Sequence, residues 1–140
     1  EHFFEIIYEA FERKDHWHVF DDVTGSDLLR KLKQSGVTLG VVSNWDSRLH
    51  KILKSTGLAD YFDFILASAE VGSAKPDKKI FAEAIRLSGI QPHEACHIGD
   101  EVKTDFDGAR NAGIHAILLD RDNQFDESIQ PKVRSFFELV

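Results

Sequence analysis

The stretch ACHIGDE, residues 95–101, decides how this chain folds, because an apolar run ends abruptly there in acidic side chains. A second run, VVSN at residues 41–44, ends in a hydroxyl and an amide in the same way. Between the two lies KPD, residues 75–77, which brings an ammonium group into the series. Short apolar runs bounded by polar residues are typical of buried strands. Each of these polar groups is therefore predicted to follow the end of a strand.

Strands and helices alternate along the rest of the chain. Near-continuous apolar runs occupy residues 37–42, 62–67, 95–98 and 115–119, and the segments between them have helical spacing. A last helix is predicted to begin near Pro131. This pattern predicts an α/β fold, a Rossmann-like three-layer arrangement with helices on both faces of a parallel sheet. Ligands bind such sheets beyond the carboxyl ends of the strands, so we expect Ser43, Lys75 and Asp100 to converge at one edge.

The composition is that of one acidic domain. The 140 residues carry a formal charge of −7, so no nucleic acid and no membrane surface is expected as a partner. No apolar run reaches the length of a membrane span. The single cysteine excludes an internal disulfide, which favours a reducing compartment and a cytoplasmic location. Methionine is absent, so Glu1 is not expected to be the natural start of the protein.

Three acidic side chains gather after the run at residues 95–98. Gly99 permits a tight backbone, Asp100 and Glu101 follow it, and Asp105 lies five residues beyond Asp100. Mg²⁺ prefers a few carboxylates and completes its shell with water and substrate phosphate, so these acids are candidate metal ligands. The alternative is that they are solvated residues at a helix start, where the helix dipole favours negative charge.

The other two polar segments suit a phosphate group. Ser43 and the backbone N–H groups that follow it, including that of Asn44, are candidates to hold phosphoryl oxygens. An ordinary N-cap is the alternative, but Asp46 and Ser47 are better placed to cap the next helix. Pro76 restricts the backbone of Lys75, whose ammonium would offset negative charge on a phosphate. Taken alone, Lys75 would more often be a surface lysine in a loop.

The order of these segments resembles the haloacid dehalogenase superfamily of hydrolases. Its second, third and fourth motifs match Ser43, Lys75 and GDEVKTD, residues 99–105. The resemblance runs from about residue 20 to the end of the chain. It implies a remnant of a helical cap at residues 1–19 and the superfamily's α/β core, with motifs two to four, at residues 20–140.

The resemblance also implies a magnesium-dependent phosphatase that acts on small phosphorylated substrates through an aspartyl-phosphate. An aspartate at the end of the first strand would attack the phosphoryl group, with magnesium bound by this nucleophile and Asp100. Glu101 or Asp105 would support the metal, Ser43 and the N–H of Asn44 would hold phosphoryl oxygens, and Lys75 would orient the nucleophile.

The superfamily's first motif, which carries the nucleophile, has no match in this chain. The nearest imitation, FDDVTG at residues 20–25, follows no buried strand and is predicted to be the hinge from cap to core. We therefore expect the chain to be inactive alone. In the superfamily the first strand lies between those that end at Ser43 and Asp100. Its absence predicts either direct pairing of residues 37–42 with 95–98, or a strand from another chain, as in strand complementation or a dimer.

Two other interpretations remain open. A receiver-like signalling domain shares the architecture and an acid, hydroxyl and lysine trio, although its acidic pair comes first and its lysine last, the reverse of the order here. A non-catalytic relative that binds a metal or a partner through a degraded site would also explain the missing nucleophile.

Overall fold

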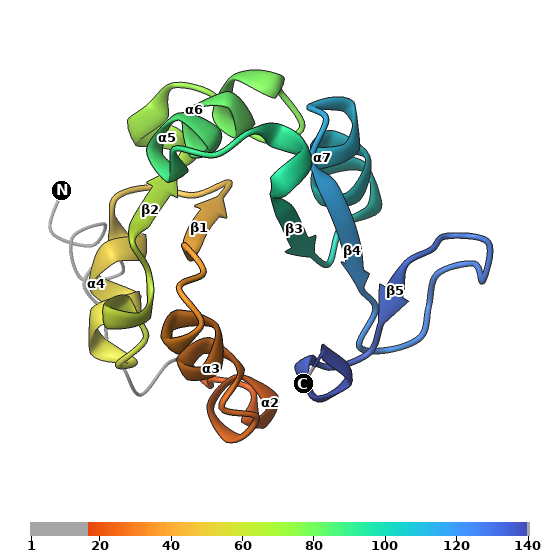
Figure 1. Cartoon of the computed structure of the whole chain (residues 1–140), viewed down its shortest axis with the longest axis horizontal. Helices are drawn as coiled ribbons and strands as arrows, with labels where there is room; N and C mark the ends of the chain where they lie inside the picture. The colour runs from red at the N-terminus through yellow and green to blue at the C-terminus, as the bar shows by residue number, and fades with distance from the viewer. Residues whose placement is uncertain (1–16, 140) are drawn as a thin grey trace, which may run out of the picture.

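The structure, a computed structural model, describes residues 17–139, in which strands and helices follow one another around a ring (Figure 1). The predicted helix at residues 1–13, and with it most of the predicted cap remnant, lies outside the described residues. The first half contains α2 (Asp21–Gly25), α3 (Leu28–Gln34), β1 (Gly40–Ser43), α4 (Arg48–Ser55), η2 (Ala59–Tyr61) and β2 (Phe64–Ala67). The second half contains α5 (Ser68–Val71), α6 (Lys78–Ser88), η3 (Pro92–Glu94), β3 (Cys96–Gly99), η4 (Val102–Asp107), α7 (Gly108–Asn111), β4 (His115–Leu119), β5 (Lys132–Val133) and η5 (Phe136–Leu139).

The strands form two parallel sheets rather than one. β1 pairs with β2, with Val41 opposite Ile65, and β3 pairs with β4, which in turn pairs with β5. The predicted α/β class with parallel strands is confirmed. Of the two alternatives predicted for the missing first strand, direct pairing of residues 37–42 with 95–98 is wrong, because β1 and β3 belong to different sheets.

The main hydrophobic core lies against β4, and α6 supplies its largest side chains. The side chain of Asp77 caps α6 by accepting a hydrogen bond from the Lys79 N–H at 2.9 Å, and Gly89 ends the helix in the left-handed region at φ 71°. Ile80 and Phe81 then point inward and are fully buried, which contributes about 1.5–3 kcal/mol each. The cluster comprises Ile80, Phe81, Phe106, Ala109, Ile114, Ala116 and Leu118, and Val42 of β1 packs against it. Because α6 also packs on β1 and β2, it joins the two sheets.

A second tie joins the two halves through Asp22. Its carboxylate accepts hydrogen bonds from Arg121 Nη1 at 2.9 Å and from the Phe136 N–H at 2.7 Å, and only 4% of the residue is exposed. Burial alone would raise the pKa of Asp22, but the hydrogen bonds from Arg121 and Phe136 outweigh it and hold the pKa below its ordinary value. The Arg121 guanidinium also lies 4.0 Å from the ring centroid of Phe20. We call this group the Asp22–Arg121 clamp.

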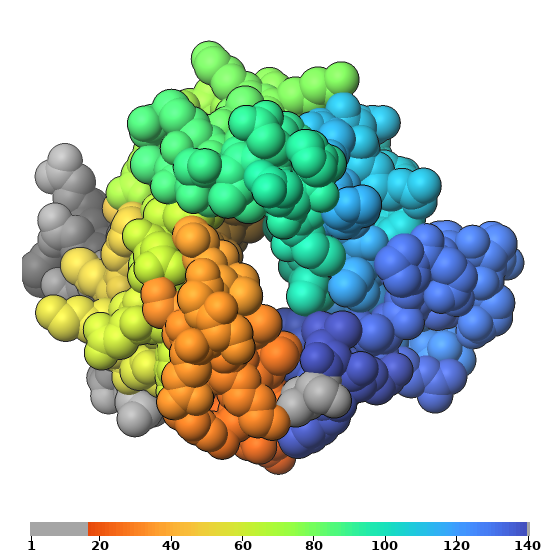
Figure 2. Space-filling model, in the orientation of Figure 1, coloured from red at the N-terminus to blue at the C-terminus, as the bar shows by residue number. Residues whose placement is uncertain are grey.

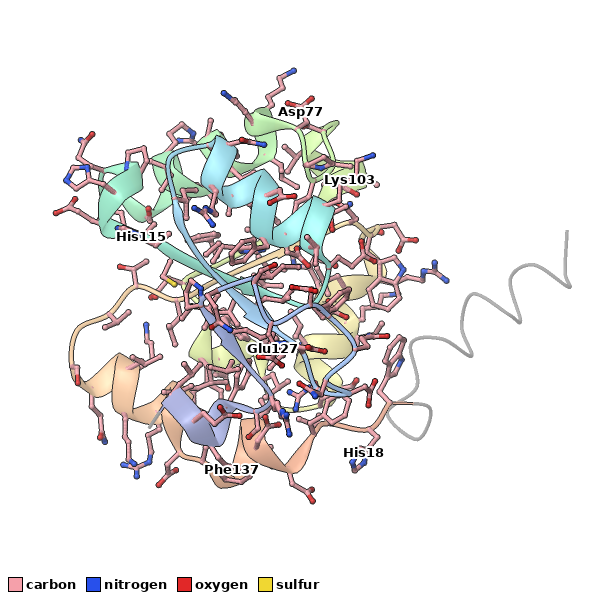
Figure 3. All side chains as sticks on the ribbon, turned by 90° about the vertical axis from the view of Figure 1, so that its right-hand side faces the viewer. His18, Asp77, Lys103, His115, Glu127 and Phe137 are labelled. Carbon is pink, nitrogen blue, oxygen red and sulfur yellow. The ribbon has the colours of Figure 1, made fainter. Side chains whose placement is uncertain are left out.

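The clamp and α6 lie on opposite sides of the molecule. Figure 1 places α2 and the C-terminus away from α6, and the side view in Figure 3 likewise places Phe137 far from Asp77, which caps α6. The segment at residues 20–25 therefore belongs to a helix that fastens the end of the chain. The residues predicted to be the hinge from cap to core form helix α2. The Asp22 carboxylate in this helix is bound by Arg121 and by the Phe136 N–H.

The C-terminal segment differs from its prediction. The helix expected near Pro131 is instead strand β5, whose Leu119↔Val133 register extends the second sheet, followed by the short 3₁₀ helix η5. Pro131 lacks an N–H but its carbonyl accepts a hydrogen bond from the Leu118 N–H at 3.0 Å, so the proline is compatible with an edge strand. Among residues 17–139, no helix combines the length and the apolar character needed to cross a membrane.

Candidate functional site

The candidate site begins where β1 ends. The Asp46 carboxylate accepts the Arg48 N–H at 3.0 Å, so Asp46 satisfies the start of α4 as predicted. Ser43 takes no part in this cap, and within residues 17–139 its hydroxyl has no hydrogen-bond partner. Ser43 thus lies half-buried at the carboxyl end of β1 with its hydroxyl available to a ligand.

The side chain of Asn44 binds the backbone of Lys75 at two points. Its Oδ1 accepts the Lys75 N–H at 2.7 Å, and its Nδ2 donates to the Lys75 carbonyl at 2.8 Å. This paired contact fixes the loop before α6 to the end of β1, and the Asp77 cap holds the next turn. From the sequence we predicted only that the Asn44 N–H holds a phosphoryl oxygen. The role of the Asn44 side chain in positioning the Lys75 loop was not predicted.

Lys75 reaches from this loop to Asp105, which follows β3. The Lys75 ammonium donates to Asp105 Oδ1 at 2.5 Å, and the two side chains are only 11% and 5% exposed. The Asp105 Oδ2 accepts the Glu101 N–H at 3.0 Å. A continuous hydrogen-bonded path therefore runs from Asn44 through Lys75 and Asp105 to Glu101, which we call the Lys75 bridge. It supports the predicted convergence of the three segments at the carboxyl ends of β1 and β3.

His97 is a further partner of Asp105 that the sequence did not indicate. Its Nε2 lies 3.1 Å from Asp105 Oδ1, and its ring packs edge-on against Phe81 with centroids 5.4 Å apart. Burial raises the pKa of Asp105, but the hydrogen bonds from His97 and Lys75 and the charge of Lys75 outweigh it and hold the pKa far below its ordinary range. Asp105 is thus an ionised carboxylate surrounded by donors.

Gly99 makes the position of Asp105 possible. A Cβ at Gly99 would lie 2.3 Å from Asp105 Cγ, a distance that real side chains do not reach. The backbone of Gly99 is not in the left-handed region, so its role is to leave space rather than to permit a special turn. His97 and Gly99 are two residues apart on β3 and face the same side, which explains why both meet Asp105.

The predicted metal ligands do not form one compact group. Asp100 and Glu101 are exposed, the Glu101 carboxylate accepts the Thr104 hydroxyl at 2.8 Å, and Asp105 is committed to Lys75 and His97. Within the described part of the chain, no three acidic, histidine or cysteine side chains lie close enough to hold a metal ion. The exposed carboxylates still fit Mg²⁺, which takes only one or two from a protein and fills its shell with water and phosphate. The metal roles of Asp100, Glu101 and Asp105 stay predictions.

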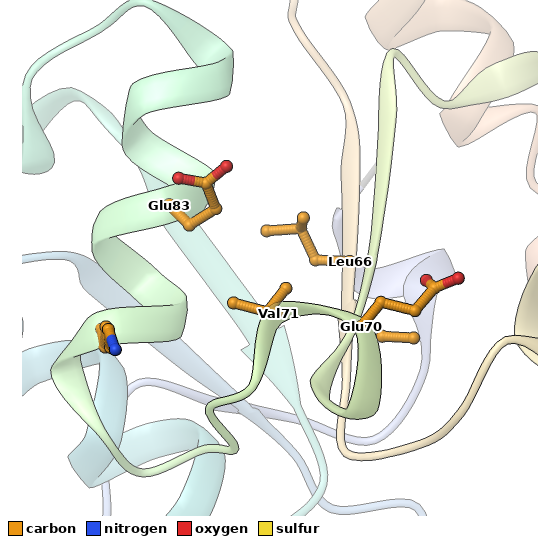
Figure 4. A pocket seen from close by; sticks show the side chains of 6 residues that line it. Leu66, Glu70, Val71 and Glu83 are labelled. Atoms are coloured by element: carbon orange, nitrogen blue, oxygen red, sulfur yellow. The ribbon is translucent and has the colours of Figure 1, made fainter.

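A pocket of about 450 Å³ lies elsewhere, between β2, α5 and α6 (Figure 4). Leu66, Ala67 and Val71 give it apolar walls, and its charged side chains are Glu70, Lys79 and Glu83. None of the predicted site residues lines it. The chemistry of Ser43, Lys75 and Asp100 therefore belongs to the strand ends and not to this pocket.

Comparison with known proteins places the chain among hydrolases of one family. The sequence profile of the haloacid dehalogenase-like hydrolase family matches residues 1–119. The human haloacid dehalogenase-like hydrolase domain-containing protein 3 is 38% identical over 129 residues, which cover 92% of this chain and 51% of that protein. A phosphoserine phosphatase of Thermus thermophilus is 37% identical over 95 residues, covering 67% of this chain and 38% of the relative.

Solved structures show the same likeness. A HAD phosphatase from Thermococcus onnurineus superposes with a TM-score of 0.82 at 32% identity, covering 87% of this chain and 56% of the other. The chain spans about half the length of the curated relatives from cattle, human and mouse that it matches. The matched residues include Ser43, Lys75 and Asp100, and the chain belongs to the haloacid dehalogenase-like hydrolase family.

Proposed function

We propose that this chain provides the phosphate-binding and metal-binding part of a magnesium-dependent phosphatase. Its substrates would be small phosphorylated metabolites, hydrolysed through an aspartyl-phosphate intermediate in the cytoplasm. The Lys75 bridge is the main support for the proposal, because it joins the Asn44 amide, which directly follows Ser43, to the Lys75 ammonium and the Asp105 carboxylate, and these groups come from three separate segments. The similarity to a phosphoserine phosphatase and to a HAD phosphatase supports the reaction class.

Each residue of the site has a distinct task in this proposal. The Ser43 hydroxyl and the Asn44 N–H hold phosphoryl oxygens, as preorganised donors do in phosphoryl transfer. The Lys75 ammonium has three N–H donors, of which one is used by Asp105, so two remain for the phosphate and the nucleophile. Asp100 and Glu101 would hold Mg²⁺, which supplies neutralising charge to the phosphate when bound.

The nucleophile is the part that the described residues do not supply. Asp22, the acid nearest to the missing motif in sequence, is buried in the clamp with Arg121 and Phe136. We propose that the nucleophilic aspartate comes from a segment that precedes Glu1 in a longer protein, and that the 140-residue chain alone does not turn over substrate.

The test compares the 140-residue chain with a form extended at its N-terminus to the length of the relatives. Hydrolysis of p-nitrophenyl phosphate with Mg²⁺ is expected only for the extended form. Asp100→Asn in that form should remove most of the activity by weakening the metal site. Asp107→Asn is the matched control, because Asp107 is an exposed acid on the same segment and should keep activity. Equal activity of the short and extended forms would refute the proposal.

A non-catalytic role is the second candidate. It is favoured by the pairing of Lys75 with Asp105, which already offsets the lysine charge, and by the lack of a three-ligand metal group in residues 17–139. An extended form that binds Mg²⁺ in calorimetry but hydrolyses no phosphomonoester would establish this alternative.

A further inference from the structure

His97 contacts the Lys75 bridge, but the proposed function gives it no task. Its side chain is 15% exposed and that of Asp105 is 5% exposed, so their contact is largely shielded from water. In the space-filling view the green segment that contains α6 lies against the teal segment that contains β3, and the rings of Phe81 and His97 meet there (Figure 2). A polar ring in such a place needs a hydrogen-bond partner, and Asp105 is that partner.

The direction of this hydrogen bond follows from the charge of its acceptor. Asp105 pairs with the Lys75 ammonium and is ionised. An ionised carboxylate accepts hydrogen bonds and donates none. The Nε2 atom of His97, which lies 3.1 Å from Asp105 Oδ1, therefore carries a proton and donates it. His97 is thus held in a form that has a proton on Nε2.

Both oxygens of the Asp105 carboxylate are engaged. Oδ1 accepts from Lys75 Nζ and His97 Nε2, and Oδ2 accepts the Glu101 N–H at 3.0 Å. Three donors hold the carboxylate against rotation about its Cβ–Cγ bond. They also leave the Lys75 ammonium only one place on Asp105, so two of its three N–H groups point elsewhere. Without His97, the carboxylate is free to turn and the ammonium turns with it.

Packing fixes His97 relative to the loop that carries Lys75. The His97 ring lies edge-on against Phe81 of α6, with centroids 5.4 Å apart. A Cβ at Gly108 would lie 3.1 Å from both Phe81 Cε2 and Pro76 Cα, so Phe81 and Pro76 both pack closely on Gly108. Pro76 directly follows Lys75. The ring that orients Asp105 and the loop that supplies the ammonium therefore share one support.

We propose that His97 is a positioning residue for phosphate binding. Through Asp105 it holds the Lys75 ammonium so that two N–H groups stay directed at the phosphate. The inference rests on the proposed function, in which Lys75 binds the phosphoryl group, and it adds a residue that does not itself touch the phosphate. The His97 side chain then sets the direction of the positive charge, while Lys75 supplies it.

Three substitutions at His97 separate its hydrogen bond from its packing. His97→Gln carries an amide N–H about as far from the backbone as Nε2, His97→Asn carries one that is too short to reach Asp105, and His97→Phe keeps a ring against Phe81 without a donor. The matched control is His115→Gln, because His115 is an exposed histidine on the neighbouring strand β4.

The expected result is a loss of phosphate affinity that follows the donor. The Asn and Phe variants should bind inorganic phosphate about tenfold more weakly than wild type, the lower end for a hydrogen bond to a charged group, because His97 acts through Asp105. The Gln variant and the His115→Gln control should stay within about twofold of wild type. A merely structural role would not distinguish Gln from Asn in this way at equal urea midpoints.

An NMR titration of the 140-residue chain with inorganic phosphate, without Mg²⁺ and followed at the Asn44 amide, measures this affinity. Long-range ¹H–¹⁵N spectra of the histidine-labelled chain should also show a proton on His97 Nε2. Equal affinity of wild type and the Asn and Phe variants would overturn the inference, as would a His97 ring with its only proton on Nδ1. Absence of any shift of the Asn44 amide in wild type at about 50 mM phosphate would overturn it too.

Hydrolysis by the N-terminally extended form is judged separately from this titration. If that form fails to hydrolyse p-nitrophenyl phosphate while the Asn and Phe variants lose phosphate affinity and the Gln variant keeps it, the proposed function falls and the role of His97 stands. If the extended form is active and all three variants bind phosphate like wild type, the role of His97 falls alone.

Discussion

Removing the Lys75 ammonium should destabilise the fold itself, because its partner Asp105 is buried. In Lys75→Met the Asp105 carboxylate, 5% exposed, keeps only His97 and the Glu101 N–H. Loss of one member of a buried ion pair costs about 3–5 kcal/mol of folding free energy. Because His97 and the Glu101 N–H still contact Asp105, we expect a loss at the lower end, about 3 kcal/mol. With an m-value of about 1–3 kcal/mol/M, the urea midpoint should fall by roughly 1–3 M.

Urea unfolding followed by tryptophan fluorescence measures this loss. Arg86→Met is the matched control, because Arg86 pairs with Glu83 at 2.6 Å on the surface and is 66% exposed, so its removal should cost less than about 1 kcal/mol. Asp105→Asn added to Lys75→Met should recover much of the loss by removing the unpaired charge. The reasoning is refuted if Lys75→Met costs no more than the control, or if the double variant is no more stable than the single one.

Two further predictions concern pH and Gly99. Folding lowers the pKa of both Asp105 and Asp22. The two ionised carboxylates therefore contribute their full stabilisation of the fold above the unfolded-state pKa of about 4, and this contribution is lost as the pH falls toward the folded-state pKa values. The urea midpoint should therefore fall between about pH 5 and pH 3, and less steeply in Asp22→Asn; a level midpoint would contradict this. Gly99→Ala should cost at least about 1–3 kcal/mol because its Cβ would overlap Asp105, whereas Gly25→Ala, with its nearest contact at 3.8 Å, should be neutral or stabilising. Equal urea midpoints for the two alanine variants would show that Gly99 does not make room for Asp105.

Elements with strong local signals were predicted closely from the sequence. β4 has the predicted bounds, and α6 is one of the helices predicted between the strands, with Asp77 as its cap and Gly89 as its end. Both signals are local, since a cap and a glycine act within one turn of the helix. The end of the chain was mispredicted because strand β5 depends on pairing with β4, which no local pattern reports.

Burial of the inner strands was the least predictable feature. An apolar run indicates that the side chains of a strand are suited to burial, whereas the fraction of each side chain that is exposed depends on which neighbouring elements cover the strand. Cys96 is exposed although its run is apolar, because β3 has a strand on one side only within the described residues. The same distinction explains why the order of the site segments was predictable from the sequence, while two alternatives stayed open for the facing edges of β1 and β3.

The segments that form the candidate site were predictable from the sequence, but the hydrogen bonds between them were not. Ser43, Lys75 and Asp100 were identified because each follows a strand or precedes a proline. The pairing of Lys75 with Asp105 and the contact with His97 depend on the space that Gly99 leaves, which is a property of the folded backbone. The alternation along β3 places His97 and Gly99 on one face, and this is the signal from which His97 could have been found.

The division into two sheets has a consequence for how the molecule unfolds. Each strand pairs only with its neighbours in sequence order, β1 with β2, β3 with β4 and β4 with β5, so each half closes its own short-range pairings. Halves of this kind can open as separate cooperative units, and α6, the Lys75 bridge and the Asp22–Arg121 clamp are among the contacts that couple them. Whether the whole chain melts in one step or two therefore rests on a few side chains, among them those that the candidate site uses.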